Sequence, residues 1–321
     1  MLLRFIVATF SAGITMLAAG IVAGQDFPQK PVRIVASEPG GAGDFAARLI
    51  AQGIAGGLGQ QIIVENRAGA GGAIAADLVA KAPADGYTLL FYANNIWLLP
   101  FMQTVPYDPV RDFSPITLAV KAPNLLVVHP SLPVKSVKEL IALAKARPGA
   151  LNYATGGTGS SNHLGAELFK ALAGVNIVRI TYKGAAPALN DVISGQVQVM
   201  FPTTAAGAPH VKAGRLTALA VTTAQPSALA PGLPTVAAAG LPGYESAAMF
   251  GMFAPTGTRD TIIQRLSQEI VRVLTREDVK EKFFNAGVET VASSPEQLAA
   301  IVKSDMARMG KVIKDAGIRG E

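Results

Sequence analysis

A glycine-rich loop with four hydroxyl side chains, at residues 155–161, is the part of the sequence best suited to bind a small molecule. A helix is expected to follow it, from about Asn162 to Ala173. The first N–H groups of a helix have no partner within the helix and carry partial positive charge, so they favour a carboxylate. Helix capping would explain any one hydroxyl, but four hydroxyls in one loop favour binding. The expected ligand contacts are Thr155, Gly157, Thr158, Gly159, Ser160 and Ser161.

A second glycine-rich loop follows the first expected strand, Val32–Ala36. Asp44 is expected to be the N-cap of the helix behind this loop, which runs through Ile54. The N-terminus of this helix also favours a carboxylate, with Asp44 either touching the ligand or only capping its helix. The expected contacts in this loop are Pro39, Gly40, Gly41 and Asp44.

The same loop offers a rival interpretation as a dinucleotide-binding site. Residues 41–46 fit the pattern G-x-G-x-x-A after a strand, and Glu65 ends the next expected strand about twenty residues later. Against this, Asp44 would place a carboxylate where the pyrophosphate must sit, and Pro39 and Gly40 lengthen the turn. An NAD(P)-dependent dinucleotide-binding enzyme is therefore the alternative to a binding protein.

The sequence contains no recognisable catalytic or metal-binding constellation. Its three histidines, His129, His163 and His210, are not within helical spacing of one another, and cysteine is absent. There is no G-x-S-x-G elbow and no pairing of a nucleophile with a base. We therefore expect no enzyme activity, no metal and no cofactor. A non-transport envelope protein is a third interpretation, which predicts a large apolar patch and no small ligand.

The N-terminal residues have the pattern of a signal peptide. Arg4 gives a short positive region, residues 5–19 are apolar, and small residues follow up to Gly24. We expect cleavage near Gly24, because the apolar run is short for a membrane span. Without cysteine there is no lipid attachment site, so the mature protein should be free in the periplasm. Its net charge of about +5, after loss of Arg4 from +6, lies in no basic run, which argues against nucleic acid as a partner.

The order of elements predicts two α/β lobes. A chain of 321 residues exceeds the size at which one core keeps growing, and from Pro31 onward β-rich runs alternate with helical patterns. Lobe 1 is expected from residues 27–122 plus 224–321, and lobe 2 from residues 123–223. Two hinge crossings, near residues 120–126 and 220–226, would let a cleft open and shut. Three tail elements are expected in lobe 1: a strand at Met249–Ala254 and helices at Asp260–Leu274 and Pro295–Asp315.

An ordered set of short motifs spans the mature chain. It includes Pro31-Val32-Arg33-Ile34-Val35, Pro39-Gly40-Gly41 with Asp44 and Arg48, Val64-Glu65-Asn66-Arg67 with Gly69-Ala70-Gly71-Gly72, Asp85-Gly86-Tyr87-Thr88-Leu89-Leu90, Pro106-Tyr107-Asp108-Pro109, Asp112-Phe113, Leu151-Asn152-Tyr153, His163-Leu164, Tyr182-Lys183-Gly184 and Ala254-Pro255. In this set the chain resembles the Bug receptors, the solute-binding component of tripartite tricarboxylate transporters.

The resemblance implies a type II periplasmic binding protein whose two lobes close on a small organic acid. It implies uptake through the membrane subunits of such a transporter, or signalling to a sensor, by a receptor expected to be monomeric. One wall would carry the loop of Pro39 to Asp44 together with Asn94 and Asn95. The other would carry the loop of Thr155 to Ser161, flanked by Tyr182, Lys183 and Pro202.

Three departures from the family pattern bear on the ligand. Ser37-Glu38 puts an acidic group beside the expected entrance. Pro202 follows Phe201 where many relatives carry Asp, so a ligand amino group loses a partner and a simple amino acid is disfavoured. Asn94-Asn95-Ile96-Trp97 replaces a short Ser/Thr-rich stretch, and Trp97 either packs within the lobe or lines the pocket.

Overall fold

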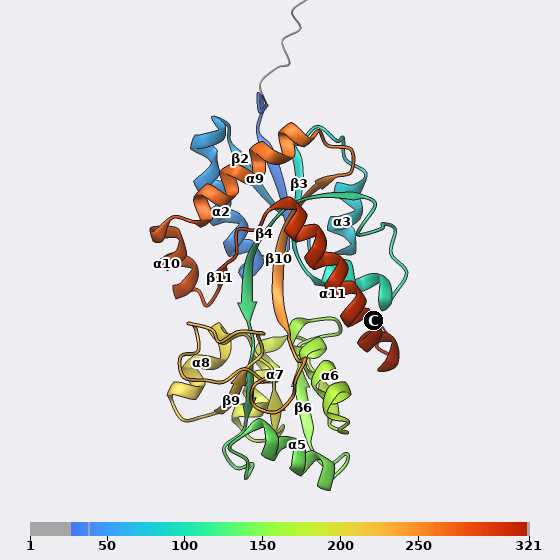
Figure 1. Ribbon diagram of the computed structural model, residues 1–321, viewed down its shortest axis with the longest axis vertical. Coiled ribbons are helices and arrows are strands. Elements are labelled where there is room, and N and C mark those ends of the chain that lie inside the picture. The colour runs from blue at the N-terminus through green and yellow to red at the C-terminus, as the bar shows by residue number, and fades with distance from the viewer. Residues whose placement is uncertain (1–26, 38, 320–321) are drawn as a thin grey trace, which may run out of the picture.

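The computed structural model describes residues 27–37 and 39–319; the expected signal peptide and Glu38 lie outside them. Two β-sheets are stacked along the long axis of the molecule (Figure 1). The first sheet has the strand order β11-β4-β10-β3-β1-β2, and the second has the order β7-β6-β8-β5-β9. The chain is therefore an α/β protein with two lobes.

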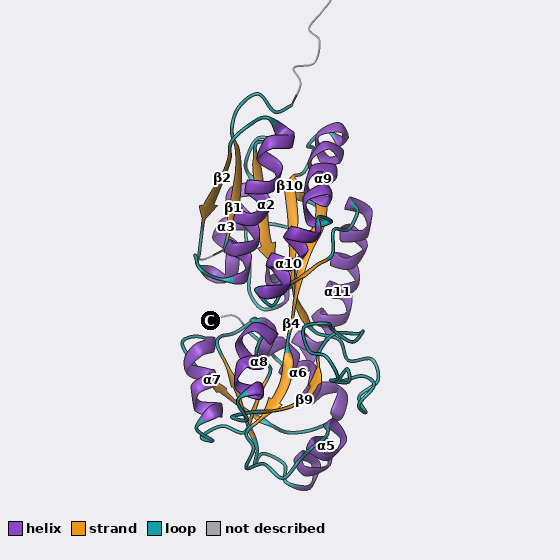
Figure 2. Cartoon of the chain, turned by 90° about the vertical axis from the view of Figure 1, so that its left-hand side faces the viewer, coloured by secondary structure: helices purple, strands orange, loops and turns teal. Residues whose placement is uncertain are grey.

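The first lobe begins with parallel β-α-β units, as the alternating pattern predicts. Its strands are β1 (Val32–Ala36), β2 (Ile62–Asn66), β3 (Thr88–Ala93), β4 (Phe113–Pro123), β10 (Ala247–Pro255) and β11 (Glu289–Thr290). Its helices, on both faces of the sheet (Figure 2), are α2 (Ala42–Leu58), α3 (Ala73–Ala80), α4 (Asn95–Leu98), α9 (Asp260–Leu274), α10 (Glu277–Asn285) and α11 (Pro295–Asp315), with short 3-10 turns η1 (Ala70–Gly72) and η2 (Leu99–Phe101).

Apolar stripes at helical spacing hold these helices on the sheet. Leu266 and Ile270 of α9 share one core with Ile50 of α2. On the other face, Val79 of α3 and Val302 of α11 belong to a second core. Both α9 and α11 have the bounds predicted from the sequence, because a continuous stripe of buried residues marks both ends of each helix.

The second lobe repeats the architecture with a smaller sheet. Its strands are β5 (Leu125–Val128), β6 (Asn152–Thr155), β7 (Val178–Thr181), β8 (Val199–Met200) and β9 (Thr217–Val221). Its helices are α5 (Val137–Ala146), α6 (Ser161–Ala173), α7 (Ala185–Ile193) and α8 (Thr204–Lys212). β6 pairs in parallel with β7 and β8, and the loop at the carboxyl end of β6 leads into the start of α6.

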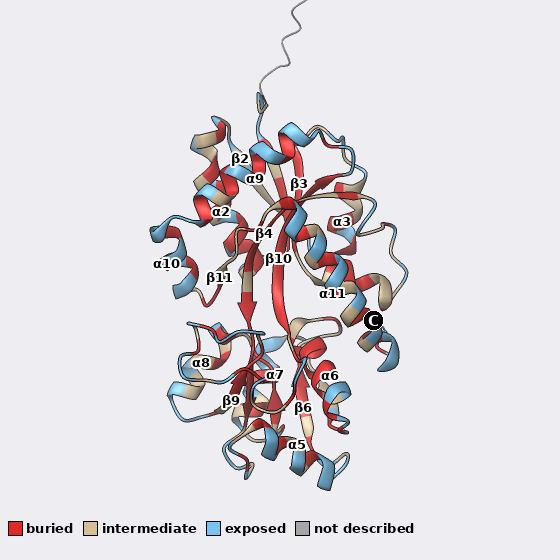
Figure 3. Cartoon of the chain, viewed as in Figure 1, coloured by how far each residue is buried: buried red, intermediate tan, exposed pale blue. Residues whose placement is uncertain are grey.

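Two strands carry the chain between the lobes. β4 passes into β5 at Asn124, and the chain returns through Ser246 into β10, which pairs with β4. Thr222 joins the two crossings: its N–H donates to the Asn124 carbonyl at 2.9 Å and its carbonyl accepts from the Ser246 N–H at 2.9 Å. All nine residues of β10 are buried (Figure 3). The hinge is thus a short ribbon whose two crossings are joined by backbone hydrogen bonds through Thr222.

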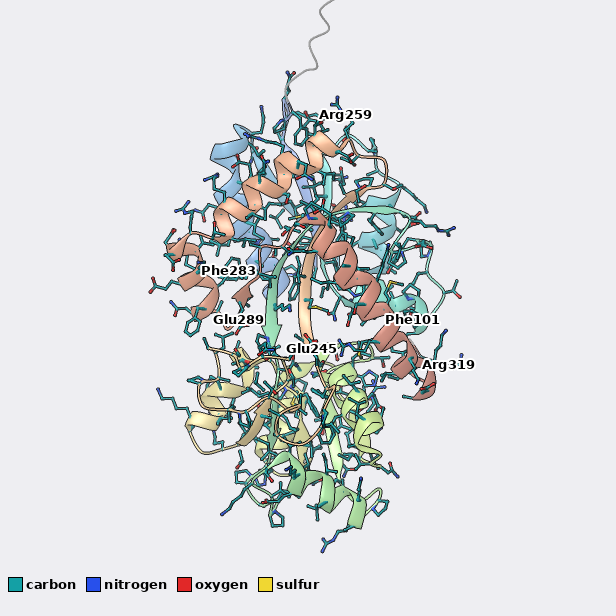
Figure 4. All side chains as sticks on the ribbon, in the orientation of Figure 1. Phe101, Glu245, Arg259, Phe283, Glu289 and Arg319 are labelled. Atoms are coloured by element: carbon teal, nitrogen blue, oxygen red, sulfur yellow. The ribbon has the colours of Figure 1, made fainter. Side chains whose placement is uncertain are left out.

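The return crossing comes later in the chain than the sequence predicts. Residues 224–246, expected in lobe 1, pack mainly on the second sheet. The Val236 N–H donates to the Val221 carbonyl at 2.9 Å, and the Tyr244 hydroxyl donates to the Gly165 carbonyl at 3.0 Å. The same segment touches the first lobe where Ser227 bonds Glu289, near the junction of the lobes (Figure 4). The rest of the predicted division into lobes stays a prediction.

Several elements are absent from the sequence prediction, above all β4. This strand contains Pro115 and Pro123, and proline argues against a central strand because it has no N–H for the ladder. The structure accommodates Pro115 next to a register shift of β10. Asp44 was also expected to be an N-cap; instead Gly41 precedes α2 and Asp44 lies inside its first turn. In the described part of the chain, no helix is long and apolar enough to cross a membrane.

Candidate functional site

A cavity of about 420 Å³ lies between the lobes, beside the hinge strands. Three glycine-rich segments surround it: the loops before α2, η1 and α6. Ala122 of β4 and Phe250 of β10 line it from the hinge ribbon. The full lining is Ser37, Gly41, Ala42, Gly43, Gly69, Gly71, Gly72, Tyr92, Ala93, Asn94, Asn95, Leu99, Met102, Ala122, Gly156, Gly157, Thr158, Gly159, Ser160, Ser161, Thr203, Ala248 and Phe250.

The wall from the second lobe is the loop between β6 and α6. Ser160 is the N-cap of α6, but its hydroxyl donates to the Gly157 carbonyl at 2.7 Å and makes no side-chain cap. The first turn of α6 contains no acidic residue. The start of a 13-residue helix therefore meets the cavity without a negative side chain of its own, which favours a carboxylate there.

Tight packing fixes this loop. A Cβ at Gly156 would lie 2.6 Å from the backbone nitrogen of Ala185, at the start of α7. A Cβ at Gly159, where φ is +77°, would lie 3.2 Å from the terminal methyl of Met102 in the first lobe. Both positions require glycine, and at Gly159 the two lobes come into contact across the cavity.

His163 holds the loop from beneath. Its Nδ1 accepts from the Gly159 N–H at 3.1 Å, and the residue is 1% exposed. Burial, assisted by the positive charge of Arg179, lowers the pKa of His163 to about 4. The imidazole is thus neutral at physiological pH, which leaves Nδ1 free to accept this hydrogen bond.

The wall from the first lobe starts with α2, whose N-terminus differs from that of α6. The Asp44 carboxylate accepts from the Gly40 N–H at 3.0 Å, from Arg48 Nε at 2.9 Å and from Asn66 Nδ2 at 2.8 Å. Burial would raise the pKa of Asp44, but hydrogen bonds from Arg48, the Gly40 N–H and Asn66 outweigh it and hold the pKa below its usual value. The protein's own carboxylate therefore occupies this helix start.

Two asparagines complete the first wall. Asn95 Nδ2 donates to the Gly71 carbonyl at 2.5 Å, and Asn95 Oδ1 is buried without a partner among the described residues. Asn94 Oδ1 accepts from the Met249 N–H at 3.4 Å, and its Nδ2 lies 3.4 Å from the Ala247 carbonyl. Asn94 therefore connects the cavity to the start of β10 in the hinge.

Trp97 lies behind this wall and does not line the cavity. It is 1% exposed and its Nε1 donates to Asp305 Oδ2 of α11 at 2.9 Å. Arg308 pairs with the other oxygen of Asp305 at 2.9 Å and also bonds the carbonyl of Glu245, at the lobe junction (Figure 4). Of the two roles left open for Trp97, packing within the lobe is the one observed.

Of the residues predicted to contact a ligand, eight line the cavity: Gly41, Asn94, Asn95, Gly157, Thr158, Gly159, Ser160 and Ser161. Their contact with a ligand stays a prediction. The structure places the others outside the lining. Pro39 and Gly40 are exposed on the loop before α2, and Thr155 is fully buried beneath its loop, bonded to Asn162 at 3.1 Å. The Asp44 carboxylate accepts hydrogen bonds from Gly40, Arg48 and Asn66 and does not line the cavity.

The three flanking predictions lie farther out. The Tyr182 hydroxyl donates to Asp191 at 2.6 Å, and burial together with this carboxylate raises the pKa of Tyr182 to about 12. Lys183 is exposed. Pro202 is buried and packs near Gly207, with its carbonyl accepting from the Leu125 N–H at 2.8 Å. Glu38, expected beside the entrance, lies outside the described residues.

The chemistry available in the cavity is that of neutral binding. Every described residue of the lining is uncharged: glycines, hydroxyl and amide side chains, and an apolar part that includes Leu99, Met102 and Phe250. None of the described lining residues is an acid or base that could exchange a proton near neutral pH. Within residues 27–37 and 39–319, no group of three or more His, Asp or Glu side chains is placed to hold a metal ion.

A family model described as "Tripartite tricarboxylate transporter family receptor" matches residues 46–318. The chain belongs to this receptor family. Among curated relatives, protein BugT of Bordetella pertussis is 36% identical over 314 residues, which is 96% of this chain and 96% of that protein. The resemblance to Bug receptors drawn from the sequence motifs is confirmed.

Two solved structures of similar proteins contain an organic acid. Rpa4515 of R. palustris "with adipate" is 40% identical, covers 92% of this chain and 100% of that chain, and has a TM-score of 0.79. MatC (Rpa3494) of Rhodopseudomonas palustris "with bound malate" is 31% identical, covers 89% and 100%, and has a TM-score of 0.74. The chain is a solute-binding receptor with the two-lobed fold of periplasmic binding proteins, so the solute-binding interpretation is favoured over the dinucleotide-binding one.

The receptor site includes residues that the sequence prediction omits. Gly69, Gly71 and Gly72 line the cavity and form the same kind of glycine-rich loop before a helix as the two predicted loops, so the pattern itself could have found them. Met102, Phe250 and Ala122 carry no such local signal. They reach the cavity because the hinge strands and η2 happen to fold beside it.

Proposed function

We propose that this receptor captures a linear dicarboxylate with an apolar middle in the periplasm. The observation that carries the proposal is a cavity whose described lining residues are all uncharged and which opens onto the acid-free start of α6. One carboxylate would dock on the loop of residues 157–161, where backbone N–H groups and hydroxyls converge. The other would reach the amide and glycine groups of the first lobe.

The apolar part of the lining supports a methylene chain between the two carboxylates. Leu99, Met102 and Phe250 offer no hydrogen bond to a hydroxylated chain. Burying methylene groups against them contributes about 0.8 kcal/mol each. The adipate held by the relative Rpa4515 has this chemistry, whereas the malate held by MatC carries a hydroxyl group.

The lining also disfavours amino acids. An ammonium group buried in the cavity needs an acidic partner, and the described lining residues include none. The proposed ligand is therefore an anion at both ends and neutral between them.

The proposed role is capture without chemistry. Ligand binding would hold the lobes together about the hinge ribbon at Asn124, Thr222 and Ser246, and the closed receptor would be recognised as a monomer by membrane subunits of a tripartite transporter, or by a sensor. The lack of an acid or base among the described lining residues supports a receptor that releases its ligand unchanged.

The first test is a melting experiment on protein unfolded and refolded to remove carried-over ligand. A ligand at about 100 times its dissociation constant should add about 2.7 kcal/mol and raise the melting temperature by about 2 °C or more. We expect a rise with adipate and similar dicarboxylates. 2-Aminoadipate is the matched control, because it adds only an ammonium group to the same chain.

Two results would overturn the ligand proposal. Equal rises with adipate and 2-aminoadipate would mean that the cavity accepts an ammonium group. No rise with any mono-, di- or tricarboxylate would remove the carboxylate from the proposal. Fractionation of cells expressing the full chain tests the compartment: recovery in the periplasmic fraction, shortened near Gly24, is the expected result.

A further inference from the structure

Arg179 is the cationic side chain bonded to the lining of the cavity. It lies on β7, next to β6, and its Nη2 donates to Thr158 Oγ1 at 2.7 Å. Thr158 is in the loop that precedes α6 and lines the cavity. The positive charge of Arg179 is therefore separated by the Thr158 side chain from the site where a ligand carboxylate is proposed to bind.

This guanidinium has no acidic partner within residues 27–37 and 39–319. No salt bridge is formed by Arg179 there, and its Nε is buried without a hydrogen-bond partner. The nearby carboxylate of Glu167 is already engaged: it accepts from Lys170 at 2.8 Å and from the Tyr153 hydroxyl at 2.5 Å. His163, which also feels the charge of Arg179, is neutral. A half-buried cation is thus left without a counter-ion among the described residues.

Two other arginines near the cavity differ in this respect. Arg48, beside the first wall, pairs with Asp44 at 2.9 Å, and Arg308, behind Asn94, pairs with Asp305 at 2.9 Å. Each of those charges is cancelled by a carboxylate of the protein. A partly buried cation without a counter-ion is costly. Because no described carboxylate is free to pair with Arg179, a bound ligand is a suitable source of the anion.

We propose that Arg179 is a positioning residue that supplies the counter-charge for the ligand carboxylate bound at the start of α6, acting across Thr158. The inference rests on the proposed function and names the source of its selectivity for anions. Because Arg179 is partly buried, its charge is screened less than that of an exposed side chain and should raise the affinity for a carboxylate by about ten- to hundredfold.

The test compares adipate binding by calorimetry in the refolded full-length mature protein and four variants. Arg179→Gln removes the charge but keeps a hydrogen-bond donor, Arg179→Met removes both, and Arg179→Lys keeps the charge. Arg215→Met is the matched control, because it removes an exposed cation of the same lobe beyond the far end of α8. Melting curves check that each variant is folded.

We expect a loss of about ten- to hundredfold for Arg179→Gln and Arg179→Met, recovery to within about fivefold for Arg179→Lys, and less than about a twofold change for Arg215→Met. Adipate binding by Arg179→Gln equal to wild type would overturn the proposal. The proposal would also be overturned if Arg215→Met lost as much adipate affinity as Arg179→Gln, because the loss would then follow from the net charge of the protein alone.

A double-mutant cycle separates charge from geometry. If Arg179 acts by its charge, Arg179→Gln still weakens binding in a Thr158→Val background. If the loss disappears in that background, Arg179 only orients the Thr158 hydroxyl and the assignment is wrong.

An NMR measurement tests the proposal in the wild-type protein, without an arginine variant. Adipate should shift the Nε–Hε resonance of Arg179 in the wild-type protein more than that of Arg215, and an unchanged resonance would contradict the proposal. A wild-type protein that binds no carboxylate would instead overturn the proposed function, so the two failures are distinguishable.

Discussion

The two lobes present glycine-rich helix starts to the same cavity, but the charges behind them are opposite. At α2, the protein's own Asp44 accepts from the loop N–H of Gly40 and is paired with Arg48. At α6, the first turn has no acid, and the loop is held by a neutral His163. Arg179 lies behind this loop without a counter-ion in the described part of the chain. Two similar loops therefore have different capacities for an anion.

This difference separates the roles of the walls. The first lobe satisfies its own charges and offers shape, amide groups and an apolar surface. The second lobe leaves a partial charge at the helix start and a full charge on Arg179 for the ligand to complete. Substitutions in the second lobe should therefore change affinity, whereas matched substitutions in the first lobe should mainly change stability.

The largest expected effect is the response of the second lobe to acid. The pKa of His163 is lowered on folding, from 6.5 to about 4, so its neutral form stabilises the fold. That stability is fully present above pH 6.5 and is lost as the pH falls towards 4, by about 3 kcal/mol. Urea unfolding at pH 7 and pH 4.5 measures it.

His163→Gln keeps an acceptor for the Gly159 N–H but cannot be protonated. We expect its free energy of unfolding to change less than that of wild type between these two pH values. If the free energy of unfolding fell equally in both proteins, groups other than His163 would cause the acid sensitivity. This difference between the lobes would then not exist.

The next effect is steric. Gly156→Ala would place a Cβ 2.6 Å from the Ala185 backbone nitrogen, which cannot move without shifting α7. We expect adipate affinity to fall by about thirty- to hundredfold, since overpacking costs about 1–3 kcal/mol and displaces the docking loop. Calorimetry measures the loss.

The matched change in the first lobe is Gly40→Ala. A Cβ there meets nothing within 4 Å, and only the backbone conformation, with φ at +82°, is disfavoured. We expect a stability loss of about 1 kcal/mol and an affinity within about threefold of wild type. A larger affinity loss than for Gly156→Ala would reverse the assigned roles.

A smaller effect is expected from the two serines at the start of α6. Ser160→Ala with Ser161→Ala removes two hydroxyls of the lining, including the bond from Ser160 to the Gly157 carbonyl. Adipate affinity should fall by about tenfold, with a change in melting temperature of less than about 3 °C. Unchanged affinity would remove this helix start from the binding site.

The smallest effect on binding is expected at Asp44. Asp44→Asn should reduce the free energy of unfolding by about 1 kcal/mol at pH 7 and leave adipate affinity within about twofold. Because the folded pKa of Asp44 is lowered, its stabilisation is present above the unfolded pKa and lost as the pH falls through the folded one. Urea unfolding should therefore show that the free energies of unfolding of the variant and the wild type converge at acidic pH. A tenfold loss of adipate affinity would contradict the assignment of ligand binding to the second lobe.

Regular periodicity made much of the fold predictable from sequence. β1 has the predicted bounds because it is a short apolar run, and α9 and α11 have theirs because their buried residues follow the helical period. β4 escaped prediction because Pro115 and Pro123 interrupt its pattern, and its place in the sheet depends on pairing with β10, over a hundred residues later. The late return of the chain to the first lobe likewise depends on contacts of Val236 and Tyr244 with distant residues.

The candidate site was predictable to a similar extent. Glycine-rich loops before helices were visible, and eight residues predicted from them or from the family resemblance line the cavity. Met102 and Phe250 could not be identified, because an apolar side chain on a hinge strand or a short turn has the same local signal as a core residue.

By itself, the sequence determined the family, the two-lobed α/β plan and the loops from which a carboxylate site could be built, because these follow from local patterns of glycine, hydroxyl and apolar residues. Only the tertiary structure decided which loop is available to an anion. The counter-ion of a charge is a neighbour in space: Arg48 lies one helical turn from Asp44, whereas Arg179 lies on a strand whose surroundings hold no free carboxylate among the described residues. Charge pairing is set by packing, and packing brings together residues that no local pattern connects.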